Sequence, residues 1–536
     1  MSDCYLGIDV GTGSARAGVF DHGGNLLASA ATDITLWREP GDIVEQSGND
    51  IWRAVCTSVR EAMAAAGIAP EAIRGIGCDA TCSLVVLGAD GVPLPVSNAG
   101  DTERNVIVWM DHRAVAQARR INATTEKVLA YVGGAISPEM ETPKLLWLAE
   151  HMPHTFAGAW QFMDLTDFLT WKATDSLVRS TCTVTCKWTY LAHEQRWDDG
   201  YFRAVGLGML ADEGFRRIGT EIVPGGTPLG RGLTARAANA LGLAPGTPVA
   251  AGLIDAHAGG IGTVGARGGV GTLLSRMAYV FGTSACTMAS TTEPAFVPGV
   301  WGPYYDSMVP GLWLSEGGQS AAGAAIDHLL RMHAAAAQTL DDAMRAGLGP
   351  SAWLSAEAAR RGGAPAVPAL VGGLHVVPEF LGNRAPFADS DARGLIAGLD
   401  MDNGPDSLLG LYLAGMCGLG YGARQIVRTL RQQNVPIDTI VISGGAGRQP
   451  LVRQLLADAT GVAVATSTST EPVLLGAAIL GAVAAGGYPD TASAMAAMSE
   501  IGTVYQPDPT TAAWHQKRFQ AFERLQAVGR AIRDDR

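Results

Sequence analysis

Residues 5–16 of the chain read Tyr5-Leu6-Gly7-Ile8-Asp9-Val10-Gly11-Thr12-Gly13-Ser14-Ala15-Arg16. The apolar part predicts a short strand, and the glycines and hydroxyls after it predict a sharp turn, because glycine has no Cβ to clash. Such a turn exposes N–H groups and hydroxyls that together suit phosphate oxygens. A second copy lies about half a chain further on, in Tyr279-Val280-Phe281-Gly282-Thr283-Ser284-Ala285. One copy alone is also consistent with a plain hairpin, but two copies predict duplicated domains that face one nucleotide from both sides.

The spacing within the first turn excludes two other nucleotide motifs. A dinucleotide fingerprint needs a third glycine at position 16, where Arg16 stands, and no stretch of the chain fits the Walker A pattern. What remains is Asp-x-Gly-Thr-x-Ser-x-Arg at the end of a strand. Asp9 beside phosphate-binding hydroxyls predicts Mg²⁺ held through water, since hard cations take oxygen ligands. The alternative is a turn carboxylate that bonds its own backbone.

Length and composition indicate a large globular enzyme. The 536 residues exceed one ordinary core, so we expect two large domains. Hydrophobic residues make up 47% and charged residues 17%, which is unlike a disordered chain. The net charge of −12 comes without a basic cluster, which argues against nucleic acid and membrane surfaces as partners. No basic residue precedes Arg16 and the apolar run 473–485 is too short to span a bilayer, so we expect a cytoplasmic protein.

Eight cysteines in so long a chain do not indicate a disulfide framework. Cys78 and Cys82 are four residues apart, and so are Cys182 and Cys186, which raises the question of a metal site. Neither spacing is that of a zinc ribbon, and no histidine lies close to either pair in the sequence. We therefore expect free thiols at these positions.

Periodicity predicts strand–turn–helix units in both halves, which is typical of α/β domains. The Gly-rich segment 259–271 breaks all periodicity and is the expected domain boundary. In the first half we expect strands at 5–10, 17–20, 26–30, 73–78 and 84–87, and helices at 50–66 and 114–132. In the second half we expect strands at 277–281, 439–442 and 462–465, and helices at 321–334, 407–431, 451–460 and 473–485, with a surface helix at 512–536.

Both turns and the later Ile440-Val441-Ile442-Ser443-Gly444-Gly445-Ala446-Gly447-Arg448-Gln449-Pro450 resemble the three nucleotide motifs of the actin, Hsp70 and sugar-kinase superfamily. Within it, the chain resembles the FGGY carbohydrate kinases over nearly its whole length. The most specific stretches are Glu45-Gln46 with Trp52, Trp109-Met110-Asp111-His112-Arg113, Met140-Glu141-Thr142-Pro143-Lys144-Leu145-Leu146-Trp147, and Gly252-Leu253-Ile254-Asp255-Ala256-His257-Ala258-Gly259. The adenosine loop departs from the family pattern at Ala446, where a third glycine is common, and at Gln449.

The resemblance implies an α/β fold of two actin-like (ribonuclease H-like) domains around an interdomain active-site cleft. Residues 1–262 would form the sugar-binding domain, residues 272–490 the nucleotide-binding domain, and residues 491–536 a tail that packs on the core. ATP and Mg²⁺ are the implied cofactors, a small sugar is the implied partner, and a homodimer is compatible with the family.

Two segments resemble the ribulokinase-like branch, most closely the D-ribulokinases. They are Asp79-Ala80-Thr81-Cys82-Ser83-Leu84-Val85 and Cys182-Thr183-Val184-Thr185-Cys186-Lys187-Trp188-Thr189. Glycerol kinases place an Arg-Glu pair, and xylulokinases a Met-His pair, roughly where Ala80 to Ser83 fall here. The resemblance therefore implies phosphorylation of D-ribulose to D-ribulose 5-phosphate, with L-ribulose or another pentulose or polyol as the alternative.

Family pattern and residue chemistry together assign roles in the cleft. Asp255 is the expected general base for the sugar hydroxyl, and its alternative role is to cap the helix that follows. Lys187 is expected to bind sugar hydroxyls or the keto oxygen, unless it is a solvated surface lysine. Glu316 is expected to hold a sugar hydroxyl, unless it only favours a helix N-terminus. His257 is expected to be a packed neighbour, and Trp109 to face the sugar.

The full expected sets follow. Substrate-binding residues are Ala80, Thr81, Cys82, Lys187, Asp255 and Glu316. ATP-binding residues are Gly11, Thr12, Gly13, Ser14, Arg16, Gly282, Thr283, Ser284, Gly445, Ala446 and Gln449. Asp9 is expected at the metal.

Two other functions compete with a kinase. A chaperone-like or actin-like ATPase predicts polymerisation surfaces or a peptide-binding β domain, and the chain has neither signature. A sugar sensor that has lost catalysis is disfavoured because Asp9, Thr12, Asp255 and Thr283 are all present.

Overall fold

The first sheet grows out of residues 5–16, and the computed structural model describes residues 3–535. Strand β1 (Cys4–Val10) turns into β2 (Ser14–Asp21) and then β3 (Leu26–Asp33), while β6 (Ile73–Ala80) and β12 (Leu253–Ile254) extend the sheet in parallel, in the order β12-β6-β1-β2-β3. Every residue of β1 is buried, because helix α1 (Gly48–Ala66) and helix α17 (Pro472–Ala484) both pack against it.

The second sheet repeats this topology. Strand β13 (Arg276–Phe281) turns into β14 (Ala285–Thr291), which pairs with β16 (Trp313–Gln319), while β19 (Thr439–Ser443) runs parallel to β13. The complete order is β15-β16-β14-β13-β19-β20-β21, with β15 at Trp301–Tyr305, β20 at Ala463–Ser467 and β21 at Ile501–Tyr505. An antiparallel meander beside parallel strands therefore occurs twice in one chain. The predicted fold class, two actin-like α/β domains, is confirmed.

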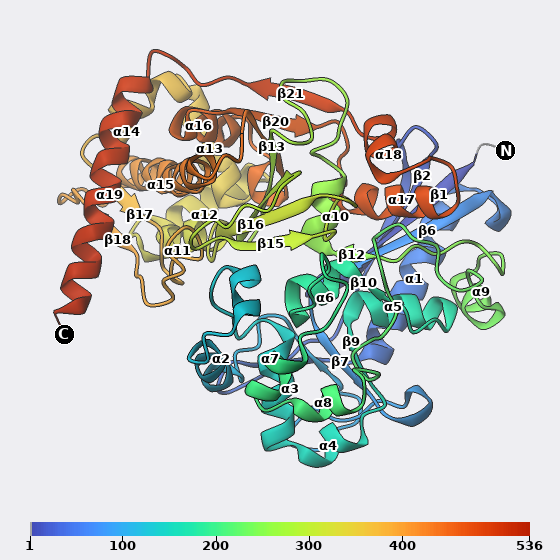
Figure 1. Cartoon of the computed structure of the whole chain (residues 1–536). Helices are drawn as coiled ribbons and strands as arrows, with labels where there is room; N and C mark the ends of the chain where they lie inside the picture. The colour runs from blue at the N-terminus through green and yellow to red at the C-terminus, as the bar shows by residue number, and fades with distance from the viewer. Residues whose placement is uncertain (1–2, 536) are drawn as a thin grey trace.

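Helices α10 (Asp255–Ile261) and α17 cross where the two halves meet. Helix α17 comes from the second half of the sequence but lies beside β1 and β6 of the first sheet (Figure 1). The approach requires glycine, because a Cβ at Gly476 would lie 1.8 Å from the carbonyl oxygen of Ala258, and one at Gly7 would lie 2.0 Å from that of Leu474. The predicted split at 262/272 thus assigns α17 to one domain by sequence while it covers the sheet of the other.

The remaining elements surround these sheets. A second five-stranded sheet of the first half has the order β4-β5-β8-β7-β9. In the first half the other elements are β4 (Trp37–Glu39), β5 (Ile43–Gln46), β7 (Leu84–Leu87), β8 (Val106–Ile107), α2 (Val115–Asn122), α3 (Glu141–His151), α4 (Pro153–Gly158), β9 (Gln161–Asp164), α5 (Leu165–Thr174), β10 (Arg179–Ser180), α6 (Thr181–Trp188), α7 (Asp199–Ala204), α8 (Gly208–Asp212), β11 (Ile222–Val223) and α9 (Ala235–Leu241). In the second half they are α11 (Gly323–Met332), α12 (Ala336–Arg345), α13 (Pro350–Arg360), α14 (Val367–Val371), β17 (His375–Val377), β18 (Leu395–Ala397), α15 (Pro405–Gln432), α16 (Pro450–Thr460), α18 (Thr491–Met498) and α19 (Ala512–Asp534).

Two sequence predictions about elements are wrong. The single helix expected at 114–132 divides into α2 and a 3-10 segment at Lys127–Val132, because Thr125 between them takes a left-handed backbone with φ 54°. The Gly-rich segment 259–271 does not break all regularity, since its first three residues complete α10. Glycine is needed there for packing, because a Cβ at Gly262 would lie 1.9 Å from the carbonyl oxygen of Pro472.

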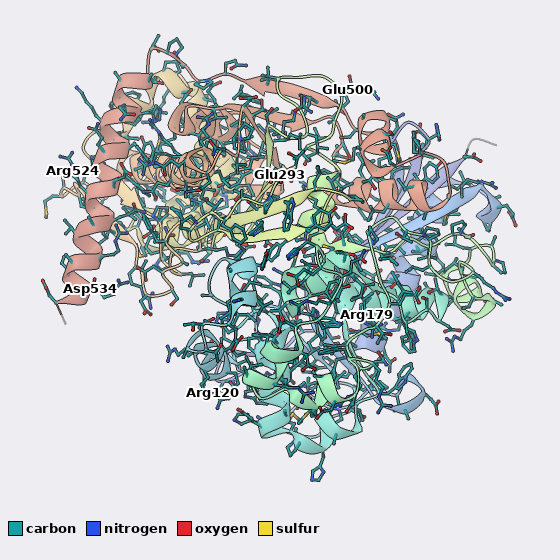
Figure 2. The ribbon with its side chains drawn as sticks, in the orientation of Figure 1. Arg120, Arg179, Glu293, Glu500, Arg524 and Asp534 are labelled. Atoms are coloured by element: carbon teal, nitrogen blue, oxygen red, sulfur yellow. The ribbon has the colours of Figure 1, made fainter. Side chains whose placement is uncertain are left out.

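Several charged side chains lie on the outside of the molecule. Arg120, Arg524 and Asp534 project from the outside of the molecule (Figure 2). Arg524 and Asp534 both lie on α19. This helix was expected at the surface, but it also buries Phe519 and Phe522 against the second core. Among the described residues 3–535, no helix combines the length and apolar character needed to cross a membrane.

Candidate active site

A cavity of about 920 Å³ lies between the two sheets, at the carboxyl ends of β1 and β13. Both Gly-Thr turns line it, as the duplicated topology requires. The sequence-predicted residues on its wall are Asp9, Gly11, Thr12, Arg16, Thr81, Cys82, Trp109, Lys187, Asp255, Gly282, Thr283, Ser284, Glu316 and Gly445. The fold therefore brings most of the expected sugar and nucleotide residues into one space.

The first turn is held in shape by one bond of its own and by bonds from two other segments. Gly11 N–H donates to the Ser14 carbonyl at 3.0 Å, which closes the hairpin. The indole Nε1–H of Trp109 donates to Thr12 Oγ1 at 3.0 Å, and the amide of Gln46 donates to the Thr12 carbonyl at 2.7 Å. Trp109, expected to face a sugar, therefore also positions the hydroxyl of the first turn.

Three carboxylates gather at the carboxyl end of the first sheet. Asp9 and Asp79 are register partners on the parallel strands β1 and β6, and Asp255 begins α10 directly after β12. Asp9 is ion-paired with Arg16, which also reaches Glu471 Oε2 at 2.9 Å. The two carboxylate oxygens of Asp79 are buried without a hydrogen-bond partner.

The environment of these carboxylates sets their pKa values. Burial, reinforced by the charge of Asp9, raises the pKa of Asp255 to about 6 and that of Asp79 well above its usual value. Asp255 also accepts a bond from the Ala256 N–H at 2.7 Å. Asp9 and Asp255, which both line the cavity, offer carboxylate oxygens of the kind that a hard divalent cation takes.

The second turn repeats the geometry of the first without its charges. Gly282 N–H donates to the Ser284 carbonyl at 2.9 Å. The Thr283 carbonyl accepts from the N–H groups of Ala322 and Ala324 at 2.9 and 3.1 Å, so the turn is tied to the start of α11. Thr283 lines the cavity.

Lys187 and Glu316 meet across the cavity from opposite halves of the chain. Lys187 Nζ on α6 lies 3.6 Å from Glu316 Oε1 on β16 and 4.7 Å from the centre of the Trp301 ring. Burial alone would raise the pKa of Glu316, but Lys187 and His257 outweigh it and hold that pKa at about 2. Lys187 is therefore a buried, paired cation rather than a solvated surface lysine.

A second interdomain ion pair lines the same end of the cavity. Arg384 Nη2 lies 3.7 Å from Glu139 Oε2, and the guanidinium also lies over Trp301 at 5.2 Å. His112 Nε2 contacts Glu139 Oε1 at 3.6 Å. Sequence reasoning missed Glu139, Arg384 and Trp301. Arg384 and Trp301 have no quoted motif around them, and Glu139 directly precedes the quoted stretch 140–147 but was not assigned a role.

Several predictions fall outside the cavity wall. Ala80 is fully buried in β6, Ser14 begins β2, and Gly13 and Gln449 also do not line the cavity. Ala446 belongs to the 3-10 turn Gly445–Gly447, and its side chain lies outside the part of the chain that the structure describes. Other members of the quoted stretch 440–450 do line the cavity, namely Ile442, Ser443, Gly444, Gly447 and Arg448. Arg453 and residues 466–472 line it as well, and the sequence did not single them out.

Fold and cavity define a class of protein: a two-domain kinase that holds a nucleotide and a small substrate between actin-like halves. Residues 4–262 match the model of the FGGY family of carbohydrate kinases, N-terminal domain, and residues 277–485 match that of its C-terminal domain. The chain belongs to the FGGY family of carbohydrate kinases and is an ATP-dependent sugar kinase.

Individual relatives agree with this assignment. The chain is 45% identical over 529 residues to the FGGY carbohydrate kinase domain-containing protein of Homo sapiens, covering 97% of this chain and 96% of that one. It is 36% identical over 515 residues to a D-ribulokinase of Saccharomyces cerevisiae, covering 90% and 72%. A crystal structure of a xylulose kinase from Brucella ovis superposes with a TM-score of 0.81 at 22% identity, covering 99% and 100%, and so supports the fold.

Proposed function

We propose that the chain transfers the γ-phosphoryl group of ATP to the 5-hydroxyl of D-ribulose, with Asp255 as the general base. The observation that carries the proposal is the placement of Asp255 in one cavity with both Gly-Thr turns and the Lys187–Glu316 pair. The 36% identity to a D-ribulokinase and the segments 79–85 and 182–189 support the choice of sugar.

The proposed chemistry is proton removal coupled to in-line displacement. The sugar hydroxyl oxygen bonds to the γ-phosphorus, the bond to the bridging oxygen of ADP breaks, and the hydroxyl proton goes to the Asp255 carboxylate. With a pKa of about 6, Asp255 is mostly ionised at neutral pH and still basic enough to take the proton. Thr12 and Thr283, with the N–H groups of their turns, hold the phosphates from opposite sides.

Mg²⁺ fits the carboxylates of the first turn. Asp9, which lines the cavity, would hold the ion through water, and the bound ion would neutralise charge on the polyphosphate. Arg16 is shared between Asp9 and Glu471 from the other half of the chain, so one guanidinium faces two carboxylates.

The sugar end of the cavity offers two pairs of hydrogen-bonding groups. Lys187 and Glu316 offer a donor and an acceptor, while Glu139 and Arg384 offer a second such pair. Thr81 and Cys82 add small side chains to the wall. A site built to bond particular hydroxyls rejects epimers, because its buried polar groups are then left unpaired. Recognition of a ketopentose rather than glycerol would follow from filling both pairs at once.

A substrate panel tests the proposal. ADP release is measured with D-ribulose, L-ribulose, D-xylulose, ribitol and glycerol, and kcat/KM for D-ribulose is expected to be at least ~10-fold above each of the others. L-ribulose is the runner-up. D-xylulose or glycerol as the best substrate would overturn the choice of sugar while leaving the kinase assignment in place.

A pair of variants adds a matched check on the sugar end. Lys187→Met keeps an unbranched side chain but removes the charge that lies over Trp301, and Glu316→Gln keeps the shape. Both are expected to raise KM for D-ribulose more than KM for ATP. An equal rise in both constants would contradict the assigned sugar-binding roles.

A further inference from the structure

Two thiols and an imidazole meet in the wall behind the sugar end of the cavity. Cys182 and Cys186 lie one turn apart on α6, and His257 lies on α10. One ligand atom from each residue lies within 4.8 Å of the other two, and Cys182 Sγ is 3.3 Å from His257 Nδ1. All three side chains are fully buried. The sequence placed no histidine near this cysteine pair because His257 follows Cys182 by 75 positions.

We infer that Cys182, Cys186 and His257 form a binding site for a thiophilic divalent ion, of which Zn²⁺ is the reference case. Zinc takes thiolate ligands at about 2.3 Å and imidazole nitrogen at about 2.0–2.1 Å in a tetrahedral array, so its ligand atoms lie roughly 3.5 Å apart. The distance of 3.3 Å between Cys182 Sγ and His257 Nδ1 is close to that spacing. Three protein ligands leave one position for water or another small ligand.

Glu316 supplies the outer contact that such a histidine needs. Its Oε2 lies 3.5 Å from His257 Nε2, on the side of the ring away from the thiols. A carboxylate there favours the proton on Nε2 and leaves Nδ1 free to bind the ion, which is the usual arrangement around metal-bound histidine. His257 Nε2, Glu316 Oε2 and the hydroxyl of Tyr304 are all buried without a full hydrogen bond, so the cluster has unused polar capacity.

The charges at this place suit a divalent cation. Two thiolates and one neutral imidazole cancel the charge of the bound ion, and the adjacent Lys187–Glu316 pair is balanced by itself. Ligand deprotonation then leaves no net charge buried in the wall. The Cys78 and Cys82 thiols, with the same spacing, have no histidine in such a cluster among the described residues.

An ion at this site would join the two helices that carry the sugar-end machinery. Lys187 lies in the last turn of α6, α10 begins with Asp255, and the N–H of Ile254 donates to Cys182 Sγ at 3.4 Å. Glu316 comes from the second sheet and covers the histidine from the cavity side. This inference stands whatever sugar the cavity takes.

Metal titration of the chelator-stripped, reduced full-length protein tests the site. Zn²⁺ is titrated against a chromophoric chelator, and Co²⁺ is titrated in parallel and followed by absorption. We expect one ion per chain, with the thiolate-to-cobalt charge-transfer band and the strong visible bands of a tetrahedral thiolate site. Cys182→Ser, Cys186→Ser and His257→Gln should each weaken Zn²⁺ binding by at least ~10-fold, and Glu316→Gln should weaken it by about 10-fold through the outer contact.

Cys417→Ser is the matched control, because Cys417 is also buried in a helix but lies in the second core, away from the cluster. It should leave Zn²⁺ affinity unchanged. Wild-type protein gives an independent measurement if a variant folds poorly: Zn²⁺ should slow alkylation of Cys182 and Cys186 by at least ~10-fold relative to Cys417 when read by mass spectrometry. A cobalt spectrum without thiolate bands, or equal zinc affinity in wild type and a folded His257→Gln, would overturn the site.

Discussion

The two Gly-Thr turns have nearly the same backbone but very different charge. Each closes a hairpin with a bond from its glycine N–H, at 3.0 Å in the first and 2.9 Å in the second, and each hairpin lies beside a parallel strand. Two residues before the glycine, however, the first has Asp9 and the second has Val280. Their partners across the hairpin differ in the same way, Arg16 in the first and Cys286 in the second.

The difference in charge indicates different roles for the two turns, although their backbones are alike. Both turns can offer N–H groups and a hydroxyl to phosphate. Only the first lies among three carboxylates, because Asp79 and Asp255 come from strands and a helix of the first sheet. We infer that the second turn only positions the nucleotide, while the first also carries the acid–base and metal-linked chemistry. Each prediction below tests one part of that contrast.

The largest effect is expected at Asp255. Asp255→Asn keeps the size and the bond to the Ala256 N–H but removes the base, and should lower kcat by at least ~10²-fold. Asp175→Asn is the control, since Asp175 is exposed at the end of α5 in a left-handed conformation that asparagine adopts readily. Steady-state ADP release checks both variants, with circular dichroism to confirm folding. Near-normal turnover in folded Asp255→Asn would remove the base from the mechanism.

The next effect contrasts Asp9 with its counterpart Val280. Asp9→Asn should raise the Mg²⁺ concentration for half-maximal activity by about 10–100-fold, because it weakens the carboxylate set that holds the ion through water. Val280→Thr, which keeps the β-branched shape, should leave the Mg²⁺ requirement unchanged. Activity is measured against free Mg²⁺ at saturating ATP. A similar shift in both variants would mean that the two turns do not differ in their relation to the metal.

How much of this contrast the sequence could reveal depends on the distance between partners. Residues 5–16 and 279–285 each contain their own strand, turn and hydroxyls, so the turns and the fold class followed from local pattern and family resemblance. The helix break at Thr125 did not, because threonine carries no signal for a left-handed backbone. Gly259 and Gly260 misled for the opposite reason: they read as helix breakers but lie inside α10. A Cβ at Gly260 would lie 2.3 Å from Met308 Sδ, so the glycine leaves room for that side chain.

The site was predictable where one segment held the chemistry and unpredictable where two segments had to meet. Asp9, Asp255 and Lys187 stand within recognisable stretches. The Glu139–Arg384 pair joins loops 245 positions apart (384 − 139). Glu139 directly precedes the quoted stretch 140–147, but nothing in that stretch indicates a partner at Arg384. Asp79 was quoted for its segment, yet its unpartnered oxygens only emerge once β1 and β6 are paired. A single sequence does not indicate which residues far apart in the chain contact each other.

Loss of the threonine hydroxyl should weaken MgATP binding by different amounts in the two turns. Thr12→Val and Thr283→Val each remove a donor to phosphate while keeping the β-branched shape, at about 1–3 kcal/mol in MgATP binding. Thr12→Val should be the more costly, because it also leaves the Trp109 Nε1–H without its acceptor. Nucleotide affinity and sugar KM are measured for both variants. Equal losses would show that the Trp109 contact adds nothing, and wild-type affinity in both would make the turns purely structural.

The smallest effect is a shift in pH dependence that only the first turn should produce. Because burial and the Asp9 charge raise the pKa of Asp255 to about 6, kcat/KM of the wild type should fall as pH drops below about 6, where the base becomes protonated. Removing the Asp9 charge relieves one cause of the raised pKa, so Asp9→Asn should move this acid limb to lower pH. Val280→Thr should not move it. The measurement is kcat/KM against pH at saturating Mg²⁺ for all three proteins, and a limb that stays in place in Asp9→Asn would show that the first turn does not tune the base electrostatically.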